Sequence, residues 1–345
     1  MWQFQTINNW QEIWSSNHIN EWECLIKESP YAHVFYTPTL VKIWIDTYID
    51  IRKISPIFIW GMDNNGCTVF MPLVLWKRNW KNAFIKCIVP VGYSDYDYHT
   101  PLFNKSPCNI EIFWIELIEY IRQHYTYDQI IIDGIVENLS IKSNYWSIGE
   151  RCPSLNLKEI HNEDQLFRFL PTKLRGDIRR QIRRLSEYGN LSLKVYQSST
   201  EAFSSFCTFL DAHNKKWPKA YKAPHFHQQL LEQGIRNNLV QFSSLDIDNS
   251  SIAWHLGFHY RSRFYYYMPA GDSTYANYSP VKIHLFYLIR WAIEHRFSIF
   301  DHLRGDENYK SGWSNECQHV CSFKQYSSNY LTQLKRAALR MRGIK

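Results

Sequence analysis

The sequence lacks several features that would place it in a special class of protein. Its 345 residues contain no apolar run approaching the roughly 18–20 residues that a membrane-spanning helix needs. The first residues, MWQFQTINNW, have neither the basic start nor the apolar core of a secretory signal peptide. Eight cysteines are scattered without a CxxC pair, and no internal repeat is visible. We therefore expect a soluble, cytoplasmic protein whose cysteines are reduced and mostly buried.

The chain is rich instead in apolar and aromatic side chains and in positive charge. Hydrophobic residues make up 45% of it and aromatic residues 17%, which suits a packed core and aromatic walls around a cleft. The length fits one large or two ordinary domains. The net charge of +7, with histidine neutral, favours an anionic partner such as a phosphate compound, a nucleic acid or an acidic surface.

Apolar periodicity predicts alternating helices and strands, and hence an α/β fold with a mixed (α+β) sheet. Two β-rich runs around Asp63–Gly66 predict a hairpin in the first half, followed by a helix at 110–125. In the second half we expect helices at 172–189, 200–216, 225–236 and 280–296, and strands at 191–197, 239–245, 251–259, 263–268, 297–303 and 318–326. A basic helix closes the chain.

The junction NYSPVKIHLF predicts a helix start that can bind an anion. Ser279 is a candidate N-cap, and Pro280 occupies the first helical position. A helix N-terminus attracts phosphate through its unpaired N–H groups and its dipole. Lys282 places a cation in the first turn, where the dipole alone would favour an acid. The alternative is an ordinary capped helix with a solvated lysine.

A dense group of charges follows the next predicted strand, in the stretch FSIFDHLRGDENYK. Ligands of α/β sheets gather at the carboxyl ends of strands, and Asp301 stands at such an end. Arg304 can pair with a carboxylate or a phosphate. The neighbouring Asp306, Glu307 and Lys310 either meet a substrate or complete an internal network of ion pairs.

These motifs, in this order, resemble the GNAT acyltransferases. Within them they resemble the cellulose-biosynthesis-associated (CelD-type) branch, which is related to the FemAB transferases. That branch shows a Ser-Pro-Gly helix start, a strand ending in Asp, then Arg-Gly-Asp/Glu and Tyr-Lys. The matching residues are Ser279, Pro280, Asp301, Arg304, Gly305, Asp306, Glu307, Tyr309 and Lys310, with Val281 in the place of the usual glycine. Weaker matches are His213, Trp217, Asp97, Tyr98 and the arginine-rich helix LRGDIRRQIRRLSEYG, so the resemblance spans about residues 35–326.

The resemblance implies two tandem GNAT-like domains with a cleft between them. The N-terminal domain, residues 1–160, would bind the acceptor, and the C-terminal domain, residues 161–345, would bind acyl-CoA. Acyl-CoA would lie along two splayed strands near 263–268 and 297–303. Tyr267 and Met268 would then lie beside it, and its pyrophosphate would meet Ser279, Pro280, Val281 and Lys282. No metal is implied.

The chemistry of acyl transfer requires a neutral amine, so a base or a chain of waters must accept its proton. The candidates for base or amine binding are Asp95, Asp97, Asp301, His99 and His213, although a lone histidine is more often structural. Asp95 and Asp97 alternate in a segment that we expect to be extended, where both can face one ammonium group. Further candidate substrate-binding residues are Tyr98, His99, Trp217, Arg304, Asp306, Glu307, Tyr309 and Lys310.

We therefore predict an N-acyltransferase that moves an acyl group from CoA to the amine of a polar acceptor. A nucleotide-linked amino sugar of surface-polysaccharide synthesis is the acceptor that the resemblance implies. One alternative is a FemAB-like aminoacyl transferase that uses aminoacyl-tRNA. Another is a non-catalytic basic protein that binds RNA or a membrane surface.

Three further patterns have simple explanations beside functional ones. Arg175, Arg179 and Arg183 recur every four residues and either contact phosphates or acids or form a solvated helix face. Cys317, His319 and Cys321 alternate, which is typical of one face of a strand and not of a zinc site. The basic tail contains no recognisable nucleic-acid-binding motif, so it is interpreted as a basic helix face.

Overall fold

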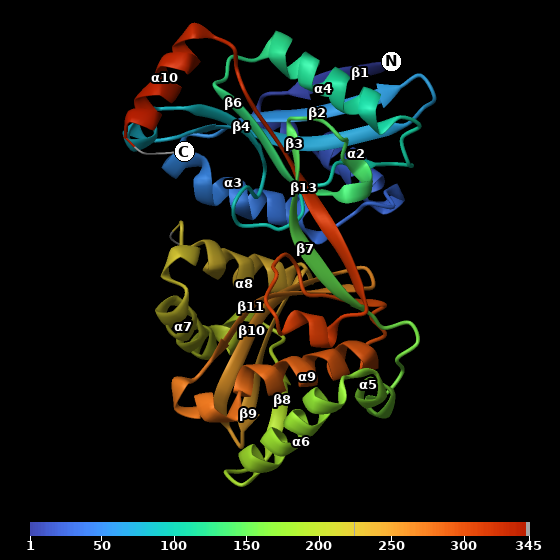
Figure 1. Cartoon of the computed structure of the whole chain (residues 1–345), viewed down its shortest axis with the longest axis vertical. Coiled ribbons are helices and arrows are strands. Elements are labelled where there is room, and N and C mark those ends of the chain that lie inside the picture. Colours follow the sequence, from blue (N-terminus) through green and yellow to red (C-terminus); the bar gives the residue numbers. More distant parts are fainter. Residues whose placement is uncertain (224, 343–345) are drawn as a thin grey trace. The chain divides into compact units, whose positions relative to one another are not determined.

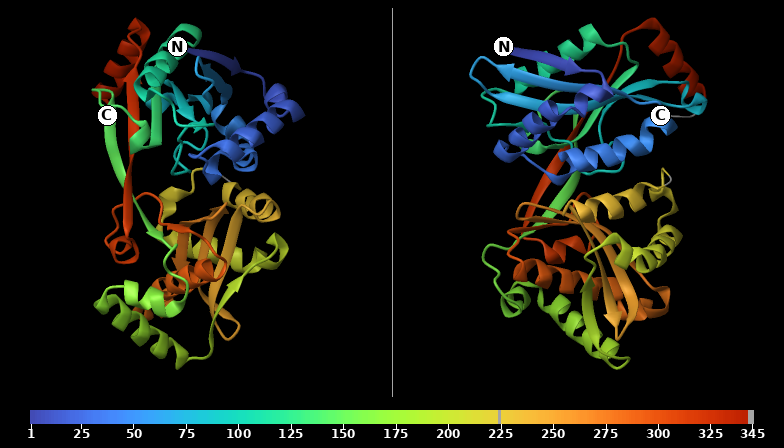
Figure 2. Two further views of the ribbon diagram at one scale, coloured as in Figure 1. Left: turned by 90° about the vertical axis from the view of Figure 1, so that its right-hand side faces the viewer. Right: turned by 180° about the vertical axis from the view of Figure 1, so that it is seen from behind.

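The computed structural model describes residues 1–223 and 225–342, which form two compact units (Figures 1 and 2). Unit 1 comprises residues 1–150 and 319–345, and unit 2 comprises residues 151–318. The chain enters unit 2 along strand β7 (Trp146–Asn156) and returns to unit 1 along β13 (Glu316–Tyr326). Unit 2 is therefore one continuous insertion in the sequence of unit 1.

This division differs from the predicted boundary at residue 160, because the C-terminal segment belongs to unit 1. In β13, the residues from Val320 to Tyr326 pair antiparallel with β6 (Gln129–Val136). The basic helix α10 (Tyr330–Met341) is then fixed by Asp128, whose carboxylate accepts hydrogen bonds from Thr332 Oγ1 at 2.8 Å and Lys335 Nζ at 2.7 Å. The predicted pattern of apolar residues found both elements but could not show which sheet they join.

The sheet of unit 1 has the strand order β1-β2-β3-β4-β6-β13, and β5 pairs with β3. The hairpin predicted around Asp63–Gly66 is present as β2 and β3, where the Asp63 carboxylate accepts hydrogen bonds from the backbone N–H groups of Asn65 and Cys67, both at 2.8 Å. The strands are β1 (Trp2–Ile7), β2 (Ser55–Asp63), β3 (Thr68–Lys77), β4 (Lys86–Pro90) and β5 (Leu102–Phe103). The helices are α1 (Trp10–Ile13), α2 (Ser16–Glu28), α3 (Pro38–Arg52) and α4 (Ile110–His124).

The core of unit 1 is largely aromatic. Helix α4 buries Phe113, Trp114 and Leu117 against the sheet, as its amphipathic pattern predicts. The indole N–H of Trp114 donates to the carbonyl of Leu139 at 2.7 Å, so this large side chain is buried without an unsatisfied donor.

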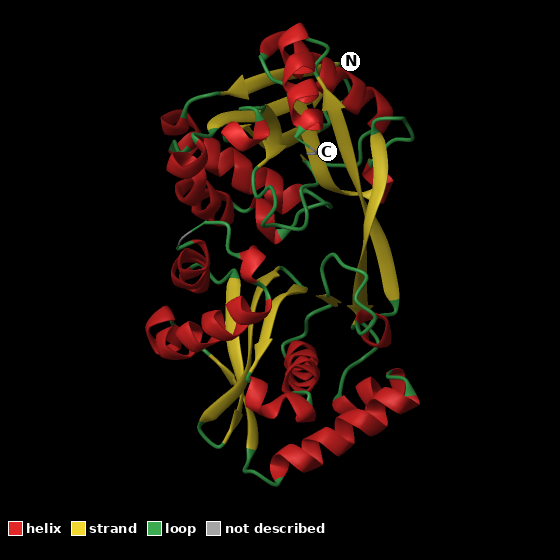
Figure 3. Ribbon diagram, turned by 60° about the vertical axis from the view of Figure 1, so that its left-hand side comes forward, coloured by secondary structure: helices red, strands yellow, loops and turns green. Residues whose placement is uncertain are grey.

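The sheet of unit 2 has the strand order β7-β12-β11-β10-β9-β8. Apart from α5, its helices and strands follow the order that the sequence predicts. Figure 3 shows the helices in red and the strands in yellow. The helices are α5 (Glu163–Phe169), α6 (Thr172–Ser186), α7 (Ser199–Lys216), α8 (Phe226–Arg236) and α9 (Pro280–Glu294). The strands are β8 (Leu191–Val195), β9 (Val240–Ile247), β10 (Ser250–Tyr260), β11 (Arg263–Gly271) and β12 (Ile299–Asp301).

Helix α9 lies at the centre of the core of unit 2. Its residues Ile283, Phe286 and Ile289 are fully buried, and Phe264 of β11 stacks on Phe300 of β12 with ring centroids 5.0 Å apart. Burying a large apolar side chain contributes about 1.5–3 kcal/mol, so this packing fixes α9 and the two strands as one rigid group.

Three observations concern the described residues as a whole. Among them, no helix combines the length and the apolar character needed to cross a membrane. All eight cysteines are unpaired thiols. No three histidine, cysteine, aspartate or glutamate side chains within residues 1–223 and 225–342 are grouped so that they could hold a metal ion.

Candidate functional site: the divergent strands of unit 2

Strands β11 and β12 pair over a short stretch and then diverge. Their parallel register joins Arg263 to Ile299, Phe264 to Phe300 and Tyr265 to Asp301. On its other side, β11 remains paired with β10 as far as Gly271. β12 ends at Asp301, whereas β11 continues to Gly271, so Tyr267 and Met268 lie in the part of β11 beyond the pairing, where the GNAT resemblance implies a splay.

A buried histidine shapes β11 at this place. The backbone N–H of Tyr267 donates to Nε2 of His255, at 3.0 Å, and the β10–β11 register shifts between Leu256 and Phe258. Burial holds the pKa of His255 well below its usual value, so the ring is neutral and can accept this bond. Gly257 is required here, since a Cβ atom would lie 2.2 Å from Cε1 of His255. Sequence reasoning missed His255, whose only signal was its place in an apolar strand.

The first turn of α9 packs against the end of β11. Pro280 begins the helix as predicted, but Ser279 has a left-handed backbone (φ 52°) and its hydroxyl does not cap the helix. The Ser279 carbonyl instead accepts from the backbone N–H of Lys282 at 3.0 Å. A Cβ atom on Gly271 would lie 2.7 Å from Cγ2 of Val281, so glycine allows this close approach. The side-chain cap predicted for Ser279 is thus wrong, because the turn before the helix places this residue in the left-handed region.

The interpretation of Lys282 as a solvated residue is also wrong. Its Nζ lies 2.6 Å from Oδ2 of Asp177 on α6, and Asp177 also pairs with Arg180 at 2.5 Å. The hydrogen bond from Lys282 is the main reason that the pKa of Asp177 is lowered. The lysine that the sequence assigns to a phosphate therefore has an internal carboxylate partner.

The charged stretch after β12 is held largely by its own side chains. Asp301 is 1% exposed, and its carboxylate accepts from Arg263 Nη1 at 2.7 Å and from the Leu303 N–H at 2.8 Å. Lys310 is 4% exposed and donates to the Arg304 carbonyl at 2.6 Å, with Glu307 Oε2 at 2.9 Å. These contacts match the expected internal network. Asp306 and Tyr309 are exposed, and Arg263 was not predicted to take part.

His213 lies in a different part of unit 2. Its Nδ1 is 3.0 Å from the hydroxyl of Tyr221, and burial, with a smaller effect of Lys216, lowers its pKa to about 4. Burial also lowers the pKa of His227 to about 4, with a smaller effect of the nearby His213. Trp217, at the end of α7, is 53% exposed. The histidine is therefore a neutral, buried member of the α7–α8 region.

The candidates of the first half all lie in unit 1. The segment from Gly92 to Tyr96 is a turn and not the predicted extended strand, because the N–H groups of Asp95 and Tyr96 donate to the Gly92 carbonyl at 2.9 and 2.8 Å. Asp95 Oδ2 accepts from Trp44 Nε1 at 3.0 Å. Burial and Asp95 together raise the pKa of Tyr48, which hydrogen-bonds this carboxylate. Asp97 is half-buried.

Tyr98 and His99 are buried in the same unit. Nδ1 of His99 lies 3.0 Å from Oδ1 of Asp133 on β6, and the hydroxyl of Tyr36 donates to the His99 carbonyl at 3.1 Å. The hydrogen-bond partner of Nδ1 is the backbone carbonyl of Asp133, at 3.1 Å, and a fully buried histidine held in this way is either a fixed core group or a positioned proton acceptor. Unit 1 thus contains Asp95, Asp97, Tyr98 and His99, whereas unit 2 contains the remaining acceptor candidates and all residues assigned to acyl-CoA.

Residues 172–311, all within unit 2, match the protein family described as "Acetyltransferase (GNAT) domain". Unit 2 therefore contains a segment that is similar to the GNAT acetyltransferase domain. No curated protein matches the chain in sequence. The predicted CelD-type branch remains a prediction, because the family match does not distinguish branches of GNAT proteins.

Solved structures extend the similarity to both units. FemX covers 96% of this chain and 99% of its own at 11% identity, with a TM-score of 0.62. The C-terminal domain of a putative lysylphosphatidylglycerol synthetase from Agrobacterium fabrum covers 93% and 95% at 9% identity, with a TM-score of 0.56. A tandem GNAT protein from the clavulanic acid biosynthesis pathway covers 95% and 100% at 10% identity, with a TM-score of 0.50. At such identities the likeness concerns the fold, and it confirms the predicted tandem GNAT-like architecture.

Proposed function

We propose that this protein is an acyl-CoA-dependent N-acyltransferase whose donor site is the divergence of β11 and β12. The observation that carries the proposal is the end of pairing at Tyr265 and Asp301, while β11 continues to Gly271 beside the first turn of α9. This geometry offers one strand for an extended pantetheine arm and one helix start for a pyrophosphate. The match of residues 172–311 to the GNAT acetyltransferase domain supports it.

Different residues of unit 2 would bind different parts of the donor. Tyr267 and Met268 would line the acyl and pantetheine groups, and a strand N–H would stabilise the oxyanion of the tetrahedral intermediate. The Val281 N–H would meet the pyrophosphate, because Pro280 has no N–H and the Lys282 N–H already donates to the Ser279 carbonyl. Lys282 would then exchange its contact with Asp177 for one with phosphate. The amine nitrogen bonds to the acyl carbon, the C–S bond breaks, and CoA leaves as a thiol after taking up a proton.

The acceptor is proposed to be a polar amine, with a nucleotide-linked amino sugar as the first candidate. Asp97, with Tyr98 and His99 beside it in sequence, would bind the ammonium group or accept its proton. His213 is the weaker candidate, because a pKa of about 4 makes it a poor proton acceptor at neutral pH. Asp95 already binds Trp44 and Tyr48, which favours a role in fixing the turn.

Binding of acetyl-CoA to the full chain tests this proposal, followed by the release of free CoA thiol in the presence of amino-sugar nucleotides. A ligand at a hundredfold excess over its Kd stabilises the native state by about 2.7 kcal/mol, which a thermal melt detects. Tyr267→Pro removes the N–H that donates to His255 and so distorts β11 at the proposed donor site, which should abolish binding. Because that variant disturbs the strand itself, Met268→Ala serves as the milder second variant. A chain that neither binds acetyl-CoA nor releases thiol would contradict the proposal.

A second candidate function is aminoacyl transfer, with aminoacyl-tRNA as the donor. The fold similarity to FemX favours it. So does the basic face of α6, where Arg179 and Arg183 are exposed while Arg175 contacts Thr172. If the protein transfers the aminoacyl group from aminoacyl-tRNA and neither binds acetyl-CoA nor uses it as a donor, this second function is favoured over the first.

A further inference from the structure

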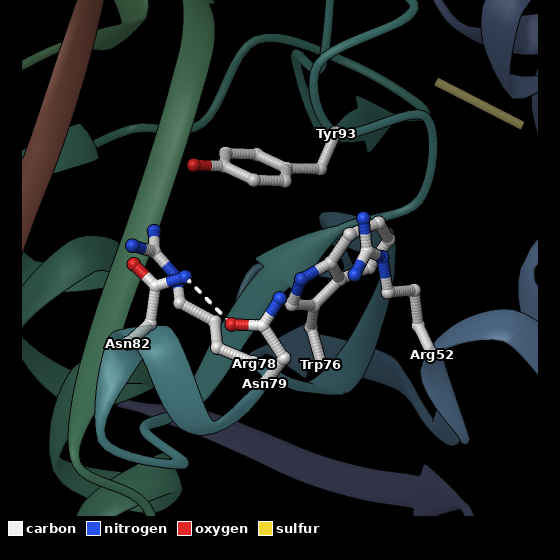
Figure 4. A pocket seen from close by; sticks show the side chains of 6 residues that line it. All are labelled: Arg52, Trp76, Arg78, Asn79, Asn82 and Tyr93. Atoms are coloured by element: carbon white, nitrogen blue, oxygen red, sulfur yellow. Dashed lines mark hydrogen bonds between the residues drawn. The ribbon is translucent and has the colours of Figure 1, made fainter.

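A cavity of about 210 Å³ lies in unit 1, between the C-terminal end of α3 and the turn that joins β3 to β4 (Figure 4). Its lining residues are Arg52, Trp76, Arg78, Asn79, Asn82 and Tyr93. None of these side chains is acidic, and each carries a hydrogen-bond donor: two guanidinium groups, two amides, a phenol and the indole N–H of Trp76. The ring of Trp76 forms an aromatic wall.

The two arginines lack the carboxylate partners that surface arginines often have. Within residues 1–223 and 225–342, neither Arg52 nor Arg78 has a carboxylate oxygen within 4.0 Å among the ion pairs. The guanidinium of Arg52 lies over the ring of Trp76, 5.3 Å from its centroid, and its Nε is buried without a hydrogen-bond partner among the described residues. Arg78 lies close enough to Tyr93 and Cys87 for its positive charge to oppose the rise in their pKa values. Both charges are therefore held by neutral groups and remain available to an anion.

The walls of the cavity are fixed by other contacts. The ring of Trp76 stacks on Trp44 at 5.6 Å and meets Tyr93 edge-on at 5.9 Å. Asn82 Nδ2 donates to Asn79 Oδ1 at 3.1 Å, and the Asn79 carbonyl accepts from the Phe84 N–H at 3.1 Å. Burial raises the pKa of Tyr93, which keeps its hydroxyl protonated and able to donate, although Arg78 opposes this rise. Preorganised donors lose little conformational entropy when a ligand binds.

We propose that this cavity binds a phosphate group, as a phosphate ester or a diphosphate, between Arg52 and Arg78. Figure 4 shows the two guanidinium groups on opposite sides of the cavity, with Tyr93 above them. Two positive charges match the charge of about −1.5 to −2 on a phosphate monoester, whereas a single carboxylate carries half as much. Guanidinium groups also suit phosphate through their fork of donors. This inference does not depend on acyl transfer, because every residue in it belongs to unit 1.

Calorimetric titration of the full chain with pyrophosphate, inorganic phosphate and succinate, at constant ionic strength, tests the site. We expect pyrophosphate to bind, and Arg78→Gln to weaken its binding about tenfold to a hundredfold, as loss of a charged hydrogen bond does. Asn79→Asp should weaken it too, because this change keeps the oxygen that accepts from Asn82 but adds a negative charge. Asn79 is exposed, so this variant should fold.

The controls separate this cavity from the proposed donor site. Arg236→Gln, at an exposed arginine on α8 in unit 2, removes one positive charge and should leave pyrophosphate binding unchanged. If Lys282→Ala weakens pyrophosphate binding and Arg78→Gln does not, the phosphate binds in unit 2, and the inference is overturned. Equal affinity for succinate and pyrophosphate would overturn the assignment to phosphate.

Discussion

Lys282 on α9 donates a hydrogen bond to Asp177 on α6 at 2.6 Å, so the first turn of α9, where we propose that the pyrophosphate binds, already contacts a carboxylate. If Lys282 leaves Asp177 to bind acyl-CoA, Asp177→Asn should strengthen the binding of acyl-CoA several-fold, because the competing charge is gone. Lys282→Ala should weaken it about tenfold to a hundredfold. Titration calorimetry of both variants measures this.

The two variants also separate binding from structure. Both groups are partly exposed, so the pair should contribute at most about 1 kcal/mol to the free energy of unfolding. If Lys282 has only a structural role, both variants lose this stability and neither changes the affinity for acyl-CoA. That result would remove Lys282 from the proposed donor site.

Arg263 and Asp301 form the most buried ion pair at the end of β12. Arg263→Met leaves a carboxylate that is 1% exposed without this partner, and we expect the free energy of unfolding to fall by about 2–3 kcal/mol. Urea denaturation measures the loss. In the matched double variant with Asp301→Asn the charge is removed as well, so much of the loss should be recovered. Equal losses in the single and double variants would show that the pair is not coupled.

Asp97 and Asp95 are predicted to differ in their effects on turnover. Asp97→Asn should lower kcat about a hundredfold, the lower range for a general base, with binding of acyl-CoA unchanged. Asp95→Asn should mainly lower the melting temperature, since Asp95 accepts from Trp44 and Tyr48. Steady-state kinetics with a saturating donor distinguishes the two. If kcat and KM for the amine are normal in both variants, the base lies elsewhere, and His99 is the next residue to test.

Unit 2 contains buried histidines whose charge depends on folding. Burial lowers the pKa of His213 and His227 to about 4, and that of His284 and His302 to about 3. The unfolded chain binds protons below about pH 6.5 that the folded chain does not bind, so stability is full above that pH and falls as the pH drops toward 4. Each such histidine should contribute a slope of about 1.4 kcal/mol per pH unit within this window.

Urea denaturation at pH 7.5, 6.0 and 5.0 tests this dependence. His213→Gln should reduce the slope by the share of one histidine. A free energy of unfolding that stays constant from pH 7.5 to 5.0 would contradict the prediction.

The order of elements could be predicted from the sequence because it depends on local periodicity. Helix α9 and strands β9–β11 were found close to their observed bounds, since their apolar residues repeat at helical or strand spacing. The partners of charged side chains could not be predicted in the same way. Lys282 and Asp177 are 105 positions apart, and Arg263 and Asp301 are 38 apart. Only the folded chain brings them together.

Backbone geometry explains the other differences. Ser94 and Ser279 both adopt a left-handed conformation, with φ of 70° and 52°, although serine does not signal it. The first residue lies in the turn that carries Asp95, and the second removes the predicted helix cap. In both places the residue types predicted a regular backbone conformation, and the positive φ of one serine gives a different local structure.

The insertion of residues 151–318 within unit 1 affects how the protein is made on the ribosome. Domains usually fold in the order of synthesis. Here the synthesis of unit 1 begins first and ends last. Strand β6 cannot pair until β13 has been synthesised, and Asp128 cannot bind α10 until that helix has been synthesised. At 5–20 residues per second, roughly ten to thirty seconds separate the two segments, during which the edge of β6 is exposed to other chains. A nascent chain stalled before β13 should therefore be prone to aggregate or to recruit chaperones, even though residues 172–311, which match the GNAT domain family, have already been translated.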